Sequence, residues 1–245
     1  MVWAATAGMV LTFRVLLPVV RNLRHQLKVV AVREEGPGIY SVTCSGRRLS
    51  DLAVSGGQYF QWRFLDRGLW WHAHPYSLSA LPQAPFLRVT IKGLGDQSRA
   101  VAHLRPGTRV FVEGPYGAFT HHVRATDRVV LIGAGVGVTP LRALLEDLPE
   151  GLQVTVVIRA SRPEEIVHRD ELADLVDRRG GRLHEVVGPR HAVPLDVRTL
   201  RRLVPGLAAS DVYVCGPDGF NDVVIASCIG AGVPGDRIHV EEFSF

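Results

Sequence analysis

The sequence is poor in cysteine and has no internal repeat or low-complexity tract. Its three cysteines, Cys44, Cys215 and Cys228, are far apart and odd in number, so nothing indicates a disulfide framework or a CxxC metal site, and a reducing compartment is favoured. Three cysteines also cannot supply the four thiolates of an iron–sulfur cluster. The ten histidines show no ligand spacing, and we expect no metal site.

Acidic residues are absent before Glu34. Five basic residues precede it: Arg14, Arg21, Arg24, Lys28 and Arg33. The net charge of +4 therefore belongs to the N-terminal segment, because the rest of the chain is close to balance. This distribution gives no reason to expect nucleic-acid binding by the body of the protein.

No uninterrupted apolar run is long enough to span a bilayer. Residues 1–13 carry no charge, whereas a spanning helix needs about 20 residues. If Arg14 snorkels, residues 1–20 could just reach across or lie in the interface; a buried or disordered N-terminal helix is the alternative. The basic flank is typical of a cytoplasmic juxtamembrane segment. We expect a protein at the cytoplasmic face of a membrane, or a cytoplasmic one if residues 1–20 do not anchor.

Residues 27–116 have the pattern of an antiparallel β-barrel. Short apolar runs alternate with Gly, Pro and Asp at the spacing of such barrels, and one short helix interrupts them at about 97–104. The predicted strands cover residues 27–32, 39–44, 58–64, 76–78, 86–91 and 109–112.

From residue 127 the pattern changes to strands that alternate with helices, which predicts a parallel sheet covered on both faces. The predicted strands are 129–132, 153–158, 182–187 and 211–214, and the predicted helices are 140–148, 168–178, 196–203 and 218–230. The boundary should fall near 121–127. We therefore divide the chain into an N-terminal segment, 1–24, and two domains, 25–124 and 125–245.

A glycine-rich turn follows the first strand of the second domain. Gly133, Gly135 and Gly137 alternate with other residues, and Thr139-Pro140 then opens a helix. We expect Thr139 to cap this helix and Pro140 to occupy its first position. Glycines allow a ligand to approach the backbone, and a helix N-terminus favours phosphate. The alternative is a purely structural turn.

Four further motifs are weak individually. His74-Pro75-Tyr76-Ser77 starts a strand and could be an ordinary packing segment. Lys92 ends a strand that leads to Asp96 and Ser98, which lie in capping range of a short helix, a second potential phosphate site. Residues 113–117 could form a plain type II turn. Residues 213–217 run from a strand into a turn and a helix.

Together, in this order, the motifs resemble the ferredoxin-NADP reductase superfamily over about residues 25–245. The nearest likeness is to the flavin region of ferric reductases and NADPH oxidases, through His-Pro-Tyr-Ser, Gly-Asp-x-Ser and Gly-Pro-Tyr-Gly. The resemblance implies an FAD-binding antiparallel β-barrel followed by an α/β, parallel-sheet NAD(P)-binding domain.

The resemblance also implies roles in FAD binding. Tyr76 would stack on the isoalloxazine, and Ser77 would hydrogen-bond near flavin N5. His74 stands where the family usually has an arginine for the pyrophosphate, so Lys92 and the helix start at Gln97-Ser98 are candidates to neutralise phosphate. Pro75 and Ile91 complete the expected FAD contacts. Phe243 would cover the flavin face, with Phe245 as the alternative.

For the nicotinamide nucleotide, the resemblance places the glycine turn at the pyrophosphate and the 215–217 motif beside the nicotinamide. Position 138 is Val rather than the glycine of GxGxxG, and Thr-Pro is the reductase form. The expected contacts are Gly133, Gly135, Gly137, Val138, Thr139, Pro140, Cys215, Gly216 and Pro217.

A basic loop follows the 153–158 strand. Arg159, Ser161 and Arg162 at its carboxyl end could hold a 2′-phosphate and favour NADPH over NADH. A solvated loop is the alternative reading.

We therefore expect an FAD-dependent NAD(P)H oxidoreductase. It would pass single electrons to ferric iron, a haem or a partner protein, with Ser77, Cys215 and Phe243 at the reacting centre. The alternative is a non-catalytic FAD-binding electron-transfer or regulatory subunit of a membrane complex.

Overall fold

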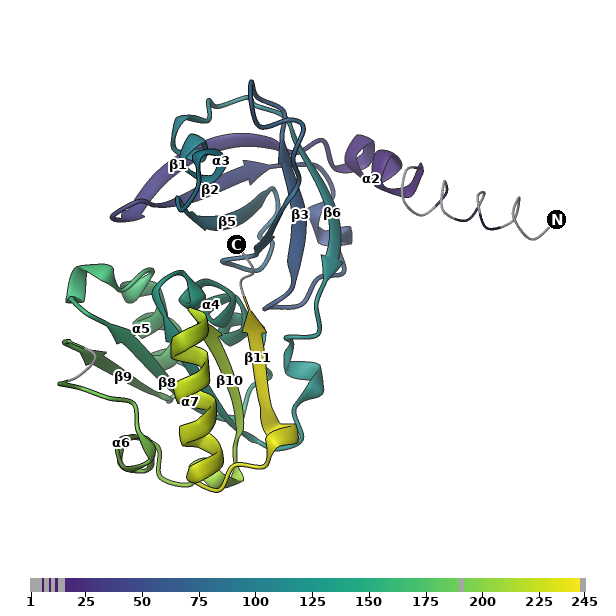
Figure 1. Ribbon diagram of the computed structural model, residues 1–245. Coiled ribbons are helices and arrows are strands. Elements are labelled where there is room, and N and C mark those ends of the chain that lie inside the picture. The colour runs from purple at the N-terminus through teal and green to yellow at the C-terminus, as the bar shows by residue number, and fades with distance from the viewer. Residues whose placement is uncertain (1–5, 7–8, 10–11, 13–15, 190–191, 243–245) are drawn as a thin grey trace.

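The computed structural model describes residues 6, 9, 12, 16–189 and 192–242. Figure 1 shows two domains, an antiparallel one that contains the earlier strands and an α/β one below it. The predicted fold class is confirmed. We propose that the two domains divide between residues 124 and 125.

The first domain contains two three-stranded antiparallel sheets. One has the order β1 (Lys28–Gly36), β2 (Ile39–Ser45) and β5 (Phe86–Lys92); the other has the order β4 (His74–Ser77), β3 (Tyr59–Phe64) and β6 (Val110–Tyr116). Isolated bridges join the sheets at both sides, at Lys28–Arg109 and Leu78–Val89. The result is a small barrel, as predicted.

The barrel core is aromatic because β3 alternates strictly. Phe60, Trp62 and Phe64 are buried, while the residues between them face outward or toward the cavity described below. A period of two places alternate side chains on one face of a strand. The Trp62 ring lies 6.2 Å from each of the other two rings, which adds edge and stacking contacts to the area that is buried.

The second domain is a five-stranded parallel sheet. Its order is β11 (Ile238–Glu242), β10 (Asp211–Gly216), β7 (Arg128–Ala134), β8 (Gln153–Ala160) and β9 (Arg182–Val187). Helices α4 (Val138–Asp147) and α5 (Arg169–Arg178) pack on one face, and α6 (Val197–Leu203) and α7 (Asp218–Gly230) on the other. The central strands are apolar on both faces for this reason.

Three sequence expectations need correction. Residues 113–116 lie within β6, where Glu113 pairs with Gln61 and Tyr116 with Tyr59, so they are not a type II turn. The predicted 97–104 helix is α3 (Asp96–Ala100) followed by a 3-10 turn at Val101–His103. Strand β11 was not predicted, although Ile238 to Glu242 fills an edge of the sheet.

Side chains of the N-terminal helix α2 (Leu17–His25) attach it to the barrel, and Asn22 makes two of these contacts. The amide of Asn22 accepts a hydrogen bond from the backbone N–H of Val112, 2.8 Å, and donates to the Val112 carbonyl, 3.1 Å. Asn22 thereby extends the ladder beyond strand β6. Within the described part of the chain, no helix is long and apolar enough to cross a membrane. Most of the predicted 1–20 segment lies outside the described residues.

Candidate functional site

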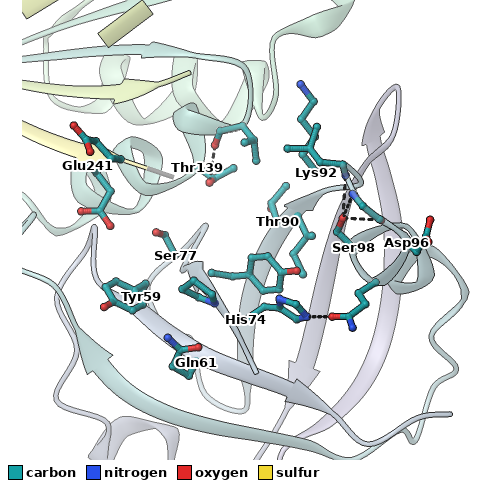
Figure 2. A pocket seen from close by; sticks show the side chains of 18 residues that line it. Tyr59, Gln61, His74, Ser77, Thr90, Lys92, Asp96, Ser98, Thr139 and Glu241 are labelled. Carbon is teal, nitrogen blue, oxygen red and sulfur yellow. Dashed lines mark hydrogen bonds between the residues drawn. The ribbon is translucent and has the colours of Figure 1, made fainter. Parts of the chain in front are cut away.

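A cavity of about 910 Å³ lies where the two domains meet. Strands β4 and β5 and the start of α3 form most of its wall, and residues from the glycine turn and the end of β11 close it from the other side (Figure 2). Of the predicted contacts, the cavity brings together His74, Pro75, Tyr76, Ser77, Ile91, Lys92, Gln97, Ser98 and Thr139.

Tyr76 and Ser77 both line this cavity from β4. The indole N–H of Trp62 donates a hydrogen bond to the Tyr76 carbonyl, 3.0 Å, so β4 is held to the barrel core beside the residue that is expected to stack. Burial raises the pKa of Tyr76 to about 12, because a phenolate is poorly solvated there. Tyr76 therefore presents a neutral ring at physiological pH.

His74 and Gln97 meet across the cavity wall. Nε2 of His74 is hydrogen-bonded to Oε1 of Gln97, which joins β4 to α3 (Figure 2). Since an amide oxygen only accepts, Nε2 carries the hydrogen and Nδ1 is left for another partner. His74, which we expect to replace an arginine, is therefore held by Gln97.

Ser98 closes its own turn. Its hydroxyl accepts hydrogen bonds from the backbone N–H groups of Leu94 and Gly95, 2.9 Å each, and donates to the Gly95 carbonyl, 3.0 Å. These bonds occupy two amides that would otherwise be available to a phosphate. Lys92, which is exposed at the rim, is then the main source of positive charge on this side of the cavity.

The glycine turn is shaped by close backbone contacts. A methyl group on Gly133 would come within 2.6 Å of Leu141, whereas Gly135, with φ +57°, faces open space within 4 Å of its Cβ position. The open side is where a pyrophosphate could approach the backbone. The turn thus has room for the pyrophosphate of a dinucleotide on the side of Gly135.

The prediction that Thr139 caps the helix after the glycine turn is wrong. Helix α4 begins at Val138, so Thr139 and Pro140 are its second and third residues and Gly137 occupies the cap. The Thr139 hydroxyl instead donates to the Val136 carbonyl, 2.8 Å. A proline is tolerated there because the first four N–H groups of a helix have no internal acceptor.

Cys215 lies directly beneath the turn. It is fully buried and pairs in register with Gly133 on one side and Glu241 on the other. Burial, with a smaller contribution from Glu241, raises the pKa of the Cys215 thiol well above its usual value. The thiol therefore stays protonated, which suits its place in the hydrophobic core and not nucleophilic attack.

Glu241 is a site residue that the sequence analysis missed. It lines the cavity from the end of β11, and Ser77 of the barrel lines the same cavity (Figure 2). Burial raises its pKa to about 7, which marks it as a group that titrates near neutrality. The apolar–polar alternation of residues 238–242 was the available signal. The expected flavin cover, Phe243 or Phe245, lies outside the described residues.

The three residues of the basic loop behave differently from one another. The Arg159 guanidinium is buried and donates to the carbonyls of Ala160, Val186 and Gly188, so its observed contacts tie β8 to β9. Arg162 is exposed and paired with Glu165, at 3.0 Å. Ser161 lies beside it, and all three are outside the cavity lining of the described residues.

Comparisons with known proteins match this arrangement. Residues 131–225 match the oxidoreductase NAD-binding domain family. A NADPH oxidoreductase of Mycobacterium tuberculosis is 29% identical over 77% of this chain and 52% of its own, and a flavohemoprotein of Chromobacterium violaceum is 32% identical over 69% and 47%. The chain spans about half the length of these curated relatives. A ferredoxin NADP⁺ reductase of Neisseria gonorrhoeae, solved with FAD and NADP, has a TM-score of 0.70 at 17% identity, covering 89% of this chain and 98% of that one.

Proposed function

Because the chain belongs to the ferredoxin-NADP reductase superfamily, we propose that it is an FAD-dependent NAD(P)H oxidoreductase. A hydride would pass from NAD(P)H to FAD, and single electrons would then leave to a one-electron acceptor. The cofactors supply the redox chemistry, and the protein supplies binding, orientation and electrostatics.

One observation carries the proposal. A single cavity is lined both by Tyr76 and Ser77 of the barrel and by Thr139 of the glycine turn, which are more than 60 positions apart in the sequence. Hydride transfer requires the donor and acceptor atoms to be held about 3–3.5 Å apart. A cavity shared by both domains is what such an approach needs.

We assign the cavity wall to FAD and the glycine edge to the nucleotide. Tyr76 would stack on the flavin, and Ser77, which is buried, would donate a hydrogen bond to its ring. The open side of Gly135 would receive the nucleotide pyrophosphate, and Cys215 would support the nicotinamide from below. None of these roles needs a general acid–base pair.

The nucleotide is NADPH in this proposal, with NADH as the competitor. Ser161 and Arg162 stand at the carboxyl end of β8, which is where adenosine ribose is bound in such sheets. Arg162 must exchange Glu165 for a 2′-phosphate. That exchange limits the expected preference for NADPH to a modest one.

For the acceptor, we propose a haem group, a ferric chelate or a redox protein. The name of the flavohemoprotein relative supports a haem partner, and the likeness to ferric reductases in the sequence motifs supports iron.

We further propose that residues 1–20 attach the protein to a membrane, on the basis of their apolar sequence and basic flank.

Parallel reduction of ferricyanide by NADPH and NADH tests the function. The purified chain, supplied with FAD and then freed of unbound FAD, should remain yellow and should reduce ferricyanide with at least one nucleotide. A folded protein that takes up FAD but shows no nucleotide-dependent reduction would instead support the non-catalytic electron-transfer subunit. A folded protein that cannot take up FAD would contradict both.

A further inference from the structure

An ion pair between two residues that do not line the cofactor cavity crosses the junction between the domains. Both terminal nitrogens of Arg88, on barrel strand β5, donate to the two carboxylate oxygens of Glu171, on α5 of the second domain, at 2.7 Å each. Such a fork fixes the relative orientation of its partners as well as their separation. It is therefore suited to set an angle between domains.

The two members of this pair are themselves held in place. The Arg88 guanidinium also donates to the Ser79 hydroxyl and carbonyl, 3.1 Å each. Nε of Arg142 lies 2.8 Å from Glu171, and Arg142 is only 9% exposed. The carboxylate is thus fixed from two domains at once, and its geometry does not depend on a single flexible side chain.

Helix α4 makes a second contact with the barrel through its acidic end. Glu146 accepts a hydrogen bond from the backbone N–H of Leu81, and Asp147 accepts one from that of Gly56, 2.8 Å each. A methyl group on Gly56 would come within 2.2 Å of the Ala143 carbonyl. The barrel backbone is therefore in direct contact with the helix that follows the glycine turn.

A third contact reaches the cofactor cavity itself. Nε2 of His168, just before α5, lies 3.0 Å from the Thr90 hydroxyl, which is in turn 2.8 Å from that of Ser41. The His168 side chain is completely buried. Thr90 lines the cavity, so the junction ends on the wall that is assigned to the flavin.

We infer that Arg88 and Glu171 are positioning residues that hold the nucleotide domain against the flavin wall at the separation hydride transfer requires. The inference rests on the proposed function. Helices α4 and α5 lie on the same face of the parallel sheet, and α4 follows the glycine turn directly. A shift at Glu171 would therefore move the nucleotide edge relative to Tyr76 and Ser77, and a misplacement of about 1 Å can lower a rate by about 100-fold.

The test uses conservative variants with a matched control. Arg88→Lys keeps the charge but loses the fork, and Glu171→Gln keeps the shape but loses the charge. The control is the Arg169–Glu185 fork, at 2.7 and 2.6 Å, which also starts on α5 but stays within one domain. Its variants are Arg169→Lys and Glu185→Gln. All are compared as full chains loaded with FAD.

The main measurement is anaerobic stopped-flow reduction of the flavin. We expect the limiting rate at saturating nucleotide to fall about 10- to 100-fold in the Arg88 and Glu171 variants, with FAD and nucleotide dissociation constants changed by less than about twofold. The control variants should keep the wild-type rate. An unchanged limiting rate in the Arg88 and Glu171 variants would overturn the inference, as would an equal fall in the control pair.

A second measurement does not depend on turnover. Small-angle X-ray scattering of the FAD-free protein should give a larger radius of gyration for the Arg88 and Glu171 variants than for the wild type and control variants. Equal radii would overturn the inference. If the wild type is not reduced by any nucleotide, the proposed function fails, and the scattering comparison still decides whether this pair holds the domains together.

Discussion

Gly137 is in contact with the backbone of Cys215. A methyl group on Gly137 would come within 2.3 Å of the Cys215 carbonyl oxygen and 2.7 Å of the Gly216 nitrogen. The strand next to the turn therefore requires a glycine at the third glycine position of the turn. Through this contact the two nucleotide motifs form one surface, although they lie on different strands, β7 and β10.

Substitution of Gly137 with alanine should separate these motifs. The new methyl group would have to displace the backbone of β10, and overpacking of this kind costs about 1–3 kcal/mol. We expect a lower unfolding midpoint in urea and weaker NAD(P)H binding. Gly219→Ala is the matched control, because it is helical and its Cβ would meet nothing within 4 Å. Equal stability of the two variants would show that β10 shifts to accommodate the methyl group without a cost in stability, which would contradict this prediction.

The Tyr76→Ala substitution should weaken FAD binding more than it lowers the stability of the protein. The ring is only partly buried against the barrel core and faces the cavity, so a stacking loss of about 0.5–1.5 kcal/mol is expected on top of the lost contact area. FAD affinity should fall by about tenfold or more, as measured by fluorescence titration, while Tyr76→Phe should retain it. Equal loss of FAD affinity and stability would assign Tyr76 to the core.

Arg162→Ala should raise KM for NADPH by several-fold and leave KM for NADH unchanged, because an exposed charge contact contributes up to about 1 kcal/mol. Glu165→Gln should have the opposite effect on NADPH, since it frees the Arg162 guanidinium, now 3.0 Å from Glu165. Steady-state kinetics with both nucleotides measure this. If neither variant discriminates between them, the 2′-phosphate is bound elsewhere.

Glu241 should make stability depend on pH. Burial raises its pKa from 4.5 to about 7, so between these values the folded protein binds a proton that the unfolded chain releases. The free energy of unfolding therefore falls as the pH rises through this window, by about 1–2 kcal/mol once solvent screening is allowed for. Thermal unfolding of the FAD-free protein from pH 4.5 to 8 should show this slope, and Glu241→Gln should flatten it. An identical slope in both proteins would place the titration on another group.

The sequence by itself determined most of the secondary structure and the order of the two domains. The alternation of Phe60, Trp62 and Phe64 and the unbroken apolar run of Val129 to Ile132 each match one kind of strand, because burial on one face or on both leaves its own pattern. The place of His74 to Ser77 in the cavity wall was expected from the family resemblance of the motifs, because the local pattern alone also fits an ordinary packing segment.

Only the tertiary structure decided which polar groups are free to act. Arg159 and Arg162 are equivalent in sequence, yet Arg159 is buried against carbonyls of β8 and the end of β9, while Arg162 is exposed beside Glu165. Glu241 lies in the site because β11 pairs with β10. Arg88 and Glu171 form their ion pair although they are 83 positions apart in the sequence. The local pattern of apolar and polar residues indicates which face of a helix or strand is buried. Contacts between residues that are distant in the sequence form only when the strands and the domains pack together.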